Sequence, residues 1–245
     1  MRALVGYTVT EAVAEIVHAV DDIAAIQCVL VPPSRLVQEE QRLPPETASA
    51  LKTGLEIRQS YRLPFWDAVL VSCFGRPLPS RDLIGRALHH NTIPAARWRI
   101  PAEECNAEEL ARITTGAVTR DGAVALLSSV IRKTGETGHL PMLDFHCPYS
   151  AENQRLATEV LVALDPGPGY LIASGESYHF IGAQLITGSD LTAFLGRALL
   201  LSPIIDRAWI AHQLIEGTCA LRISAKPGTT EPPRVVALHN KPAVE

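Results

Sequence analysis

The chain has 245 residues, of which 47% are hydrophobic and 20% charged, and its formal net charge at pH 7 is −4. It can bury a sizeable core as one large domain or two small ones, which excludes a disordered, collagen-like or disulfide-stapled chain. The negative charge argues against indiscriminate nucleic-acid binding but leaves room for a local basic groove, since residues 197–241 carry six basic and three acidic side chains.

Cysteine usage and hydropathy predict the compartment. The five cysteines include no Cys-x-x-Cys pair and are odd in number, which is typical of a reduced cytoplasm and argues against structural zinc. The longest apolar runs fall far short of a membrane span. The N-terminus meets acidic residues by Glu11 and Glu15, so it is a poor secretion signal. We therefore expect a cytoplasmic protein without a membrane partner.

The first part of the chain, residues 1–120, is expected to form an N-terminal α/β half whose role the sequence leaves unassigned. Asn106 followed three residues later by Glu109 has the form of a helix capping box. In chain order the patterns predict a strand at Ala3–Tyr7, a helix from Thr10 to about Val20, a strand at Ile26–Val31, a helix at Pro45–Ser60, a strand at Pro64–Phe74, and helices at Ser80–His90, Asn106–Thr115 and Arg120–Lys133.

The second part, residues 121–245, gives clearer signals. They predict a strand at Leu140–Cys147, a helix at Ser150–Leu164, strands at Tyr170–Ser174 and Tyr178–Leu185 around a tight Gly175-Glu176 turn, a helix at Ser189–Leu201, a strand at Thr218–Ser224, and a further candidate strand at Arg234–His239. The order βαββαβ predicts an antiparallel sheet with two helices on one face. The expected fold class is therefore α+β, with this half packed against the first.

Three of these predicted strands divide into an apolar and a polar face, because successive strand side chains point to opposite sides. Asp144 and His146 share the polar face of the first strand, His179 lies on that of the hairpin, and Arg222 on that of the last. An exposed antiparallel face is often polar by default. Histidine is an unusual choice for such a face, so we interpret this one as a site.

The same segments resemble the motifs of the archaeo-eukaryotic primase superfamily. Ile172-Ala-Ser-Gly-Glu-Ser-Tyr-His-Phe-Ile resembles its Ser-Gly-x-Gly-x-His hairpin, and Met142-Leu-Asp-Phe-His its Asp-x-Asp motif. Ile204-Ile205-Asp206 resembles its third motif, and Leu221-Arg222-Ile223 falls where primase-polymerase members place an arginine. The resemblance covers roughly Leu140 to Ser224 and implies a primase-like fold whose C-terminal half is an RRM-like sheet.

The resemblance also implies roles for individual residues. Asp144 and Asp206 become metal ligands, with His146 beside them, and His179 becomes a contact to the incoming triphosphate. Arg222 becomes a phosphate or template contact, and the hairpin residues Ser174, Gly175 and Ser177 line the nucleotide.

Two positions depart from the family pattern. Ser177 replaces the second glycine of the hairpin motif, which is a mild change, and His146 replaces the second aspartate of the first motif. Because imidazole suits Mn²⁺, Zn²⁺ or Fe²⁺ better than Mg²⁺, the second change matters for a site expected to use Mn²⁺ or Mg²⁺. Three hypotheses follow: an enzyme that favours Mn²⁺, a one-metal enzyme with different chemistry, or a domain that has lost catalysis but still binds nucleotides or nucleic acid.

The leading hypothesis is a primase or primase-polymerase that transfers nucleotides from triphosphates onto single-stranded nucleic acid or a primer-template. The alternative is a catalytically altered primase-like module that binds nucleotide or nucleic acid inside a larger complex, with a helicase or nuclease as partner. A metal-dependent phosphoesterase on the same polar face is a third reading.

Other candidates carry weaker signals. A Ser177–His179 hydrolase pair would lie in a hairpin, whereas a nucleophile elbow needs a strand-to-helix turn. A zinc site of His139, His146 and Cys147 lacks a second ligand pair with metal-finger spacing. His89-His90 is interpreted as structural, and Phe65-Trp66 and Trp98 as core or interface anchors, with base stacking as the alternative.

Overall fold

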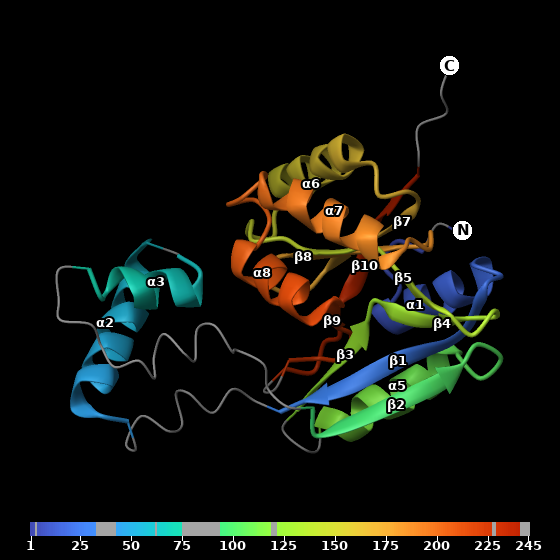
Figure 1. Ribbon diagram of the computed structural model, residues 1–245, viewed down its shortest axis with the longest axis horizontal. Coiled ribbons are helices and arrows are strands. Elements are labelled where there is room, and N and C mark those ends of the chain that lie inside the picture. The colour runs from blue at the N-terminus through green and yellow to red at the C-terminus, as the bar shows by residue number, and fades with distance from the viewer. Residues whose placement is uncertain are drawn as a thin grey trace. The chain divides into compact units, whose positions relative to one another are not determined.

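Figure 1 shows the computed structural model of the chain, which describes residues 1–2, 4–32, 43–61, 63–74, 94–118, 122–226 and 229–240. The chain forms two compact units. Unit 1 comprises residues 1–33 and 93–245, and unit 2 comprises residues 34–92. Unit 2 is thus an insertion within unit 1. The helix predicted at Ser80–His90 and the pair His89-His90 lie outside the described residues.

Unit 2 contains two described helices, α2 (Pro45–Tyr61) and α3 (Phe65–Val71). Its small core joins Leu51 of α2 to Trp66 and Val69 of α3. The helices approach so closely at Gly54 that an added Cβ would lie 2.8 Å from the Cα of Val69. The strand predicted at Pro64–Phe74 is wrong: this short apolar run is helical because one side of it packs on α2.

The larger sheet of unit 1 has six strands: β1 (Ile23–Val31), β2 (Ala96–Pro101), β3 (Ala123–Leu127), β4 (Ser129–Arg132), β5 (Thr137–His139) and β9 (Ala220–Arg222). All pairings are antiparallel. One edge of β1 pairs with β2 and the other with β3 and β4, which continue each other around Ser128. The predicted helix at Arg120–Lys133 is therefore wrong, since this segment forms β3 and β4.

Helices α1 (Val9–Ala19) and α5 (Ala107–Val118) pack their apolar sides into the main core, where they contact each other and α5 also contacts β3. Thr8 and Glu11 form a capping box at the start of α1, two residues before the predicted cap. Asn106 caps α5 as predicted, since its Oδ1 accepts the backbone N–H of Glu109 at 2.9 Å. Trp98 packs against the same core.

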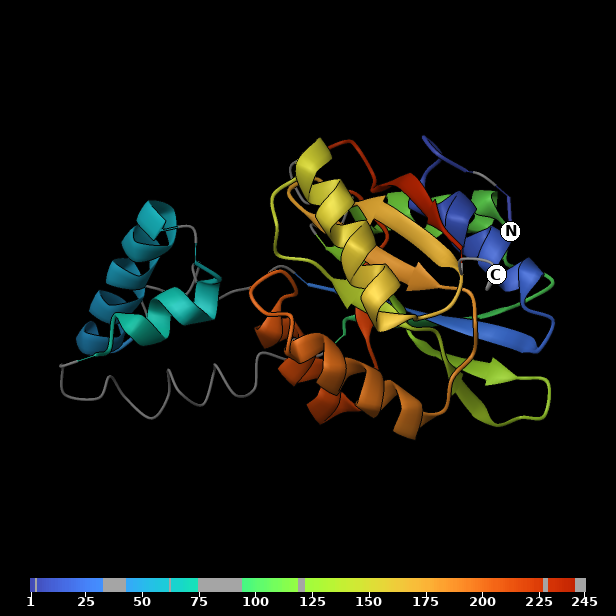
Figure 2. The ribbon, with the colours of Figure 1, turned by 90° about the horizontal axis from the view of Figure 1, so that it is seen from above.

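The smaller sheet has four antiparallel strands in the order β10 (Arg234–His239), β7 (Gly169–Ala173), β8 (Tyr178–Gly182) and β6 (Met142–Asp144). Helices α6 (Ala151–Leu164) and α7 (Gly188–Leu199) lie along one side of it (Figures 1 and 2). The Tyr178 hydroxyl donates to the Ser150 carbonyl at the start of α6. His179, the next residue along β8, therefore faces the other way.

The α+β class with antiparallel sheets is confirmed, whereas one detail of the predicted βαββαβ sheet is wrong. The strand predicted at Thr218–Ser224 exists as β9, but it pairs with β3 in the six-stranded sheet, and β10 occupies the outer position beside β7. Helix α8 (Arg207–Glu216) precedes β9 and was not predicted. The six-stranded sheet takes strands from both sides of residue 120. Across the described ranges, none of the helices is both long and apolar enough to cross a membrane.

Candidate functional site

The candidate site is a row of three side chains across adjacent strands. Asp144 at the end of β6 lies directly opposite His179 of β8. On the other side of β6, Phe145 forms a bridge with Ile205. The backbone N–H of Asp206 donates to the Asp144 carbonyl at 2.9 Å, so Asp206 is opposite Asp144. Because directly opposed residues share a face, His179, Asp144 and Asp206 lie in one row.

A short irregular segment places Asp206 in this row. Residues 204–206 run beside β6, and the His146 N–H donates to the Ile204 carbonyl at 2.8 Å. Asp206 then starts α8: its Oδ1 accepts the N–H groups of Ala208 and Trp209 at 2.9 and 3.0 Å. One carboxylate oxygen therefore caps the helix, and Oδ2 makes none of these capping bonds.

The protonation of Asp144 is controlled by its surroundings. Burial, followed by repulsion from the Asp206 carboxylate, raises the pKa of Asp144 to about 8, while the positive charges of Arg222 and Lys226 oppose this shift. The carboxyl group is therefore largely protonated at neutral pH when no further cation is near. An additional positive charge at this place would favour the ionised form.

His179 is neutral at the same pH. Burial and the nearby charges of Arg222 and Lys226 lower its pKa to about 3. Its Nε2 lies 3.5 Å from Asp144 Oδ1, which is a contact between two uncharged groups at neutral pH. The Nδ1 atom is buried and has no hydrogen-bond partner among the described residues. A buried ring nitrogen without a partner is one that a ligand atom can satisfy.

The hairpin between β7 and β8 borders the row. The Ser174 N–H donates to the Ser177 carbonyl at 2.9 Å, and Gly175 has a φ of 109°, which favours glycine. The Arg222 guanidinium donates to the Ser174 carbonyl at 2.6 Å, which ties β9 to the turn. The Ser177 hydroxyl donates to the Phe145 carbonyl. That bond occupies Ser177 with the backbone, which argues against the Ser177–His179 hydrolase reading.

Lys226 is a site residue that the sequence motifs did not reveal. Its charge acts on both Asp144 and His179, and its Nζ lies 3.1 Å from Glu176 Oε1 at the tip of the hairpin. The available signal was a second basic residue four positions after Arg222. Together Arg222 and Lys226 give the row of acids and histidine a basic border.

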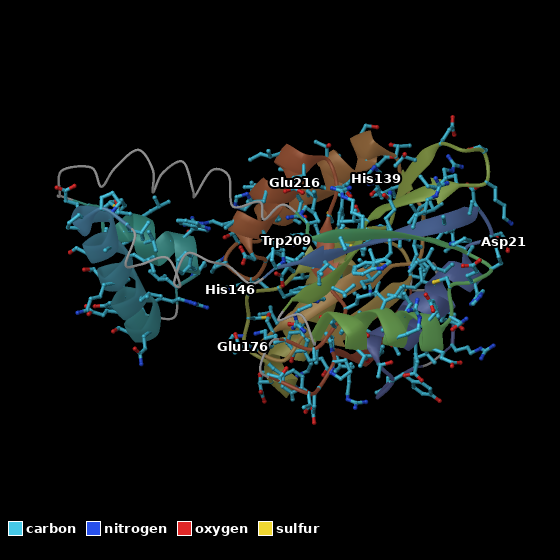
Figure 3. The ribbon with its side chains drawn as sticks, turned by 90° about the horizontal axis from the view of Figure 1, so that it is seen from below. Asp21, His139, His146, Glu176, Trp209 and Glu216 are labelled. Atoms are coloured by element: carbon cyan, nitrogen blue, oxygen red, sulfur yellow. The ribbon has the colours of Figure 1, made fainter. Side chains whose placement is uncertain are left out.

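His146 lies one row further along the strand. It shares the face of Asp144, but residues two apart on a strand are separated by about 7 Å. Figure 3 labels His146 and Glu176 at the same end of unit 1. In the ranges that the structure describes, no three His, Cys, Asp or Glu side chains are grouped closely enough to hold a metal ion, and Asp144, His146 and Asp206 are no exception. His139 instead bonds Ser128 through Nδ1 at 3.3 Å.

Comparison of the chain with known protein families identifies the family to which it belongs. The family described as AEP-like, archaeo-eukaryotic primase 1D-like, matches residues 104–234, which is 131 of the 245 residues. The chain belongs to this archaeo-eukaryotic primase-like family. The family assignment made from the motifs is thereby confirmed. No curated protein and no solved structure matches the chain.

The primase-like region contains all the residues of the row and its basic border. It begins after β2 and includes Asp144, His179, Asp206, Arg222 and Lys226. A primase-like module implies binding of nucleotides and nucleic acid in general, and members of the family are generally dependent on divalent metal ions. The strands β1 and β2 and all of unit 2 precede the matched region.

Proposed function

We propose that this primase-like protein is a nucleotidyltransferase that adds nucleotides to a nucleic-acid strand with a divalent cation, Mn²⁺ or Mg²⁺. The observation that carries the proposal is the row His179–Asp144–Asp206 with Arg222 and Lys226 at its border. In the transfer, a hydroxyl oxygen of the strand forms a bond to the α-phosphorus, and the bond from that phosphorus to pyrophosphate breaks. The reaction needs anionic oxygens for a cation and positive charge for the phosphates. Asp206, and Asp144 once a nearby cation favours its ionised form, would supply the oxygens, and Arg222 and Lys226 would supply the positive charge.

The donor set fits a cation that the substrate helps to hold. Mg²⁺ in nucleotide sites is bound by one or two carboxylates, with phosphates and water as its other ligands. Asp144 and Asp206 are two adjacent carboxyl groups, and their repulsion contributes to the raised pKa of Asp144. They would hold the ion, with His146 as a further ligand one row away. When bound, such an ion neutralises developing charge and lowers the pKa of the attacking hydroxyl.

The remaining groups act on the nucleotide. The neutral imidazole of His179 would contact the triphosphate beside Asp144, its buried Nδ1 having no partner among the described residues, and Lys226 would add positive charge. The hairpin residues Ser174, Gly175 and Ser177 would line the nucleotide, and the space beside Gly175 is open, since a Cβ added there would meet no atom within 4 Å. Arg222 fixes the hairpin through Ser174.

A specific observation supports the second candidate, a module that binds nucleotide without transferring it. Histidine stands at position 146 where the family motif has a carboxylate, and the basic groups already have partners within the chain: Arg222 bonds backbone carbonyls, and Lys226 pairs with Glu176 at the surface. Such a module would work inside a larger complex, and a helicase or nuclease is the partner we propose for it.

Incorporation of labelled nucleotides separates the two candidates. The purified protein is given ribonucleoside or deoxyribonucleoside triphosphates, Mg²⁺ or Mn²⁺, and primed or unprimed single strands. The matched control is Asp206→Asn, which keeps a good helix cap while removing the charge. Product that disappears in this variant supports the transferase. No product under any metal, from folded protein that still binds a fluorescent nucleotide, overturns it in favour of the binding module.

A further inference from the structure

An exposed aromatic side chain stands at the tip of the β7–β8 hairpin, outside the row already described. Tyr149 follows β6 in the chain, and 55% of it is exposed. Its backbone N–H donates to the carbonyl of Glu176, at the tip of the hairpin, at 2.9 Å. The Glu176 side chain in turn pairs with Lys226. The hairpin tip therefore contacts an aromatic residue through its backbone and a positively charged residue through its side chain, at the end of unit 1 where Figure 3 labels Glu176.

The segment that carries Tyr149 is fixed by hydrogen bonds on both sides. Ser150 caps α6 by accepting the Asn153 N–H at 3.1 Å, and Asn153 Nδ2 donates to the Pro148 carbonyl at 2.7 Å. The hydroxyl of Tyr178 bonds both the N–H and the carbonyl of Ser150. The rings of Tyr149 and Tyr178 have their centroids 5.4 Å apart. The exposed ring is thus preorganised, so that little conformational freedom is lost when a ligand binds to it.

Helix capping explains the fixed segment but not the ring. An apolar side chain just before an N-cap often packs against the fourth residue of the helix. In α6 that residue is Gln154, which is polar and whose Nε2 donates to the Val236 carbonyl at 3.3 Å. Tyr149 does cover the buried ring of Tyr178. That contact occupies part of the Tyr149 side chain and leaves more than half of the residue in water, beside the candidate site.

We infer that Tyr149 is a stacking platform for a base of the single-stranded nucleic acid on which this protein acts. Single-strand binding sites combine aromatic rings, on which bases stack, with positive charge that follows the backbone. The hairpin tip brings Tyr149 and Lys226 together through Glu176. This combination distinguishes Tyr149 from an isolated exposed aromatic, which needs no explanation on a protein surface. The inference rests on the proposed function and names a contact for its strand.

The position of the ring favours a strand over the incoming nucleotide. Tyr178 and His179 are neighbours on β8 and therefore point to opposite faces of the sheet. The ring of Tyr149 contacts Tyr178, whereas the triphosphate contact proposed for His179 is on the other face. A base stacked on Tyr149 therefore belongs to a chain that passes over the hairpin tip. A single strand fits this place because its base faces are open, whereas a duplex hides them.

The test is binding of fluorescein-labelled oligo(dT) at low salt to the full chain and to Tyr149→Ala. Removing one base–aromatic stack should weaken binding at least about fivefold, whereas Tyr149→Phe, which keeps the ring, should bind within about twofold of the unmodified chain. The matched control is Tyr7→Ala, because Tyr7 is 48% exposed and lies beside β10, at the opposite edge of the four-stranded sheet. Circular dichroism and urea unfolding check that each variant is folded.

A strand without bases separates stacking from a purely structural effect. An abasic strand of the same length keeps the phosphates, so Tyr149→Ala should bind it as the unmodified chain does. An equal loss on both strands would mean that the substitution disturbs the loop, and would overturn the inference. It is also overturned if Tyr149→Ala binds oligo(dT) normally, if Tyr149→Phe or Tyr7→Ala loses as much as Tyr149→Ala, or if the unmodified chain binds no oligo(dT).

The outcomes also separate this inference from the proposed function. Nucleotide incorporation by the unmodified chain, with normal strand binding in Tyr149→Ala, leaves the transferase standing and removes the platform. Strand binding that depends on the ring, without incorporation under any metal, keeps the platform and removes the transferase. Binding of a fluorescent nucleotide is expected to be unchanged in Tyr149→Ala. A loss there with normal strand binding would place the base of the nucleotide on the ring and overturn the inference.

Discussion

The two sheets of unit 1 carry polar residues in opposite ways. In the four-stranded sheet, Asp144 and His179 are largely removed from water, with 27% and 8% of their side chains exposed, and their pKa values shift to about 8 and about 3. In the six-stranded sheet, Arg97 and Arg99 stand in solvent at an edge. Burial changes the acid–base chemistry of a group, whereas exposure makes its charge available to a large partner.

Truncating one core side chain in each sheet should give the largest difference in the free energy of unfolding. Phe180 is fully buried in the four-stranded sheet, and its ring lies so near Gly169 that an added Cβ would approach it to 2.5 Å. We expect Phe180→Ala to lower the free energy of unfolding by about 3–5 kcal/mol. Val29→Ala, in the small buried cluster of Val29, Ala125 and Leu127, should cost about 1–2 kcal/mol. Urea unfolding measures the free energy lost by each variant. Equal losses would show that the two sheets do not differ in packing at these positions.

Stability should fall with pH above pH 6.5 because of the buried row. For Asp144, whose pKa is 3.8 when unperturbed and about 8 in the fold, the folded chain keeps a proton that the unfolded chain has lost, so stability decreases as pH rises toward 8. His179, with an unperturbed pKa of 6.5 and about 3 in the fold, has the opposite effect, but only below pH 6.5. Between pH 6.5 and 8 the loss is at most about 2 kcal/mol.

The matched variant for this pH dependence is Asp144→Asn, which keeps the shape and removes the titration. Urea unfolding at several pH values should show a flat profile for the variant above pH 6.5. If the variant loses stability as steeply as the unmodified chain, another group causes the decrease, and the contrast between buried and exposed polar groups is weakened.

Asp206 has a structural and a proposed chemical role, and two variants should separate them. Asp206→Ala removes the cap of α8 and should cost about 1 kcal/mol in the free energy of unfolding, whereas Asp206→Asn should cost little. Both should lose nucleotide incorporation, because the charge is absent in both. An alanine variant as stable as the asparagine variant would show that the cap contributes nothing measurable.

The smallest expected effect concerns Glu176. Its ion pair with Lys226 is on the surface, with 80% of the Glu176 side chain exposed, so Glu176→Gln should change stability by less than about 0.5 kcal/mol. If Lys226 contacts the triphosphate, releasing it should increase nucleotide affinity a few-fold, measured by titration with a fluorescent nucleotide. A decrease in affinity would mean that Glu176 helps to position Lys226.

The motifs predicted which side chains come together better than they predicted the sheets around them. Asp144, His179 and Asp206 were singled out because their motifs resemble a known family, and the structure brings them into one row, while their roles stay predictions. The segment 123–132 was mistaken for a helix because its strands are buried on both faces: Val124 and Leu126 face the main core, and Ala125 and Leu127 the small cluster. Without alternation of polar and apolar residues, a buried strand and a buried helix look alike in sequence.

Local sequence patterns also could not predict which strands pair when they lie far apart in the chain. The strand at Thr218–Ser224 was recognised, but its partner β3 lies about a hundred residues earlier in the chain, and nothing in either segment specifies that pairing. The alternation of Arg97-Trp98-Arg99-Ile100 was a usable signal for β2, since its arginines are exposed and Ile100 is buried. His146 was correctly placed on the face of Asp144, but its role as a metal ligand stays a prediction.

The insertion of unit 2 has a consequence for how the protein is put together. Leu30 and Ala96 are opposite each other in β1 and β2, and the Ala95 N–H donates to the Leu30 carbonyl at 2.9 Å. The intervening residues therefore leave and re-enter the sheet at one point, as the loop of a hairpin does, however long that loop is. Such an excursion can be gained, exchanged or shortened without altering a single strand pairing. Unit 2 is thus joined to the six-stranded sheet at one point, and none of the described strand pairings runs through it.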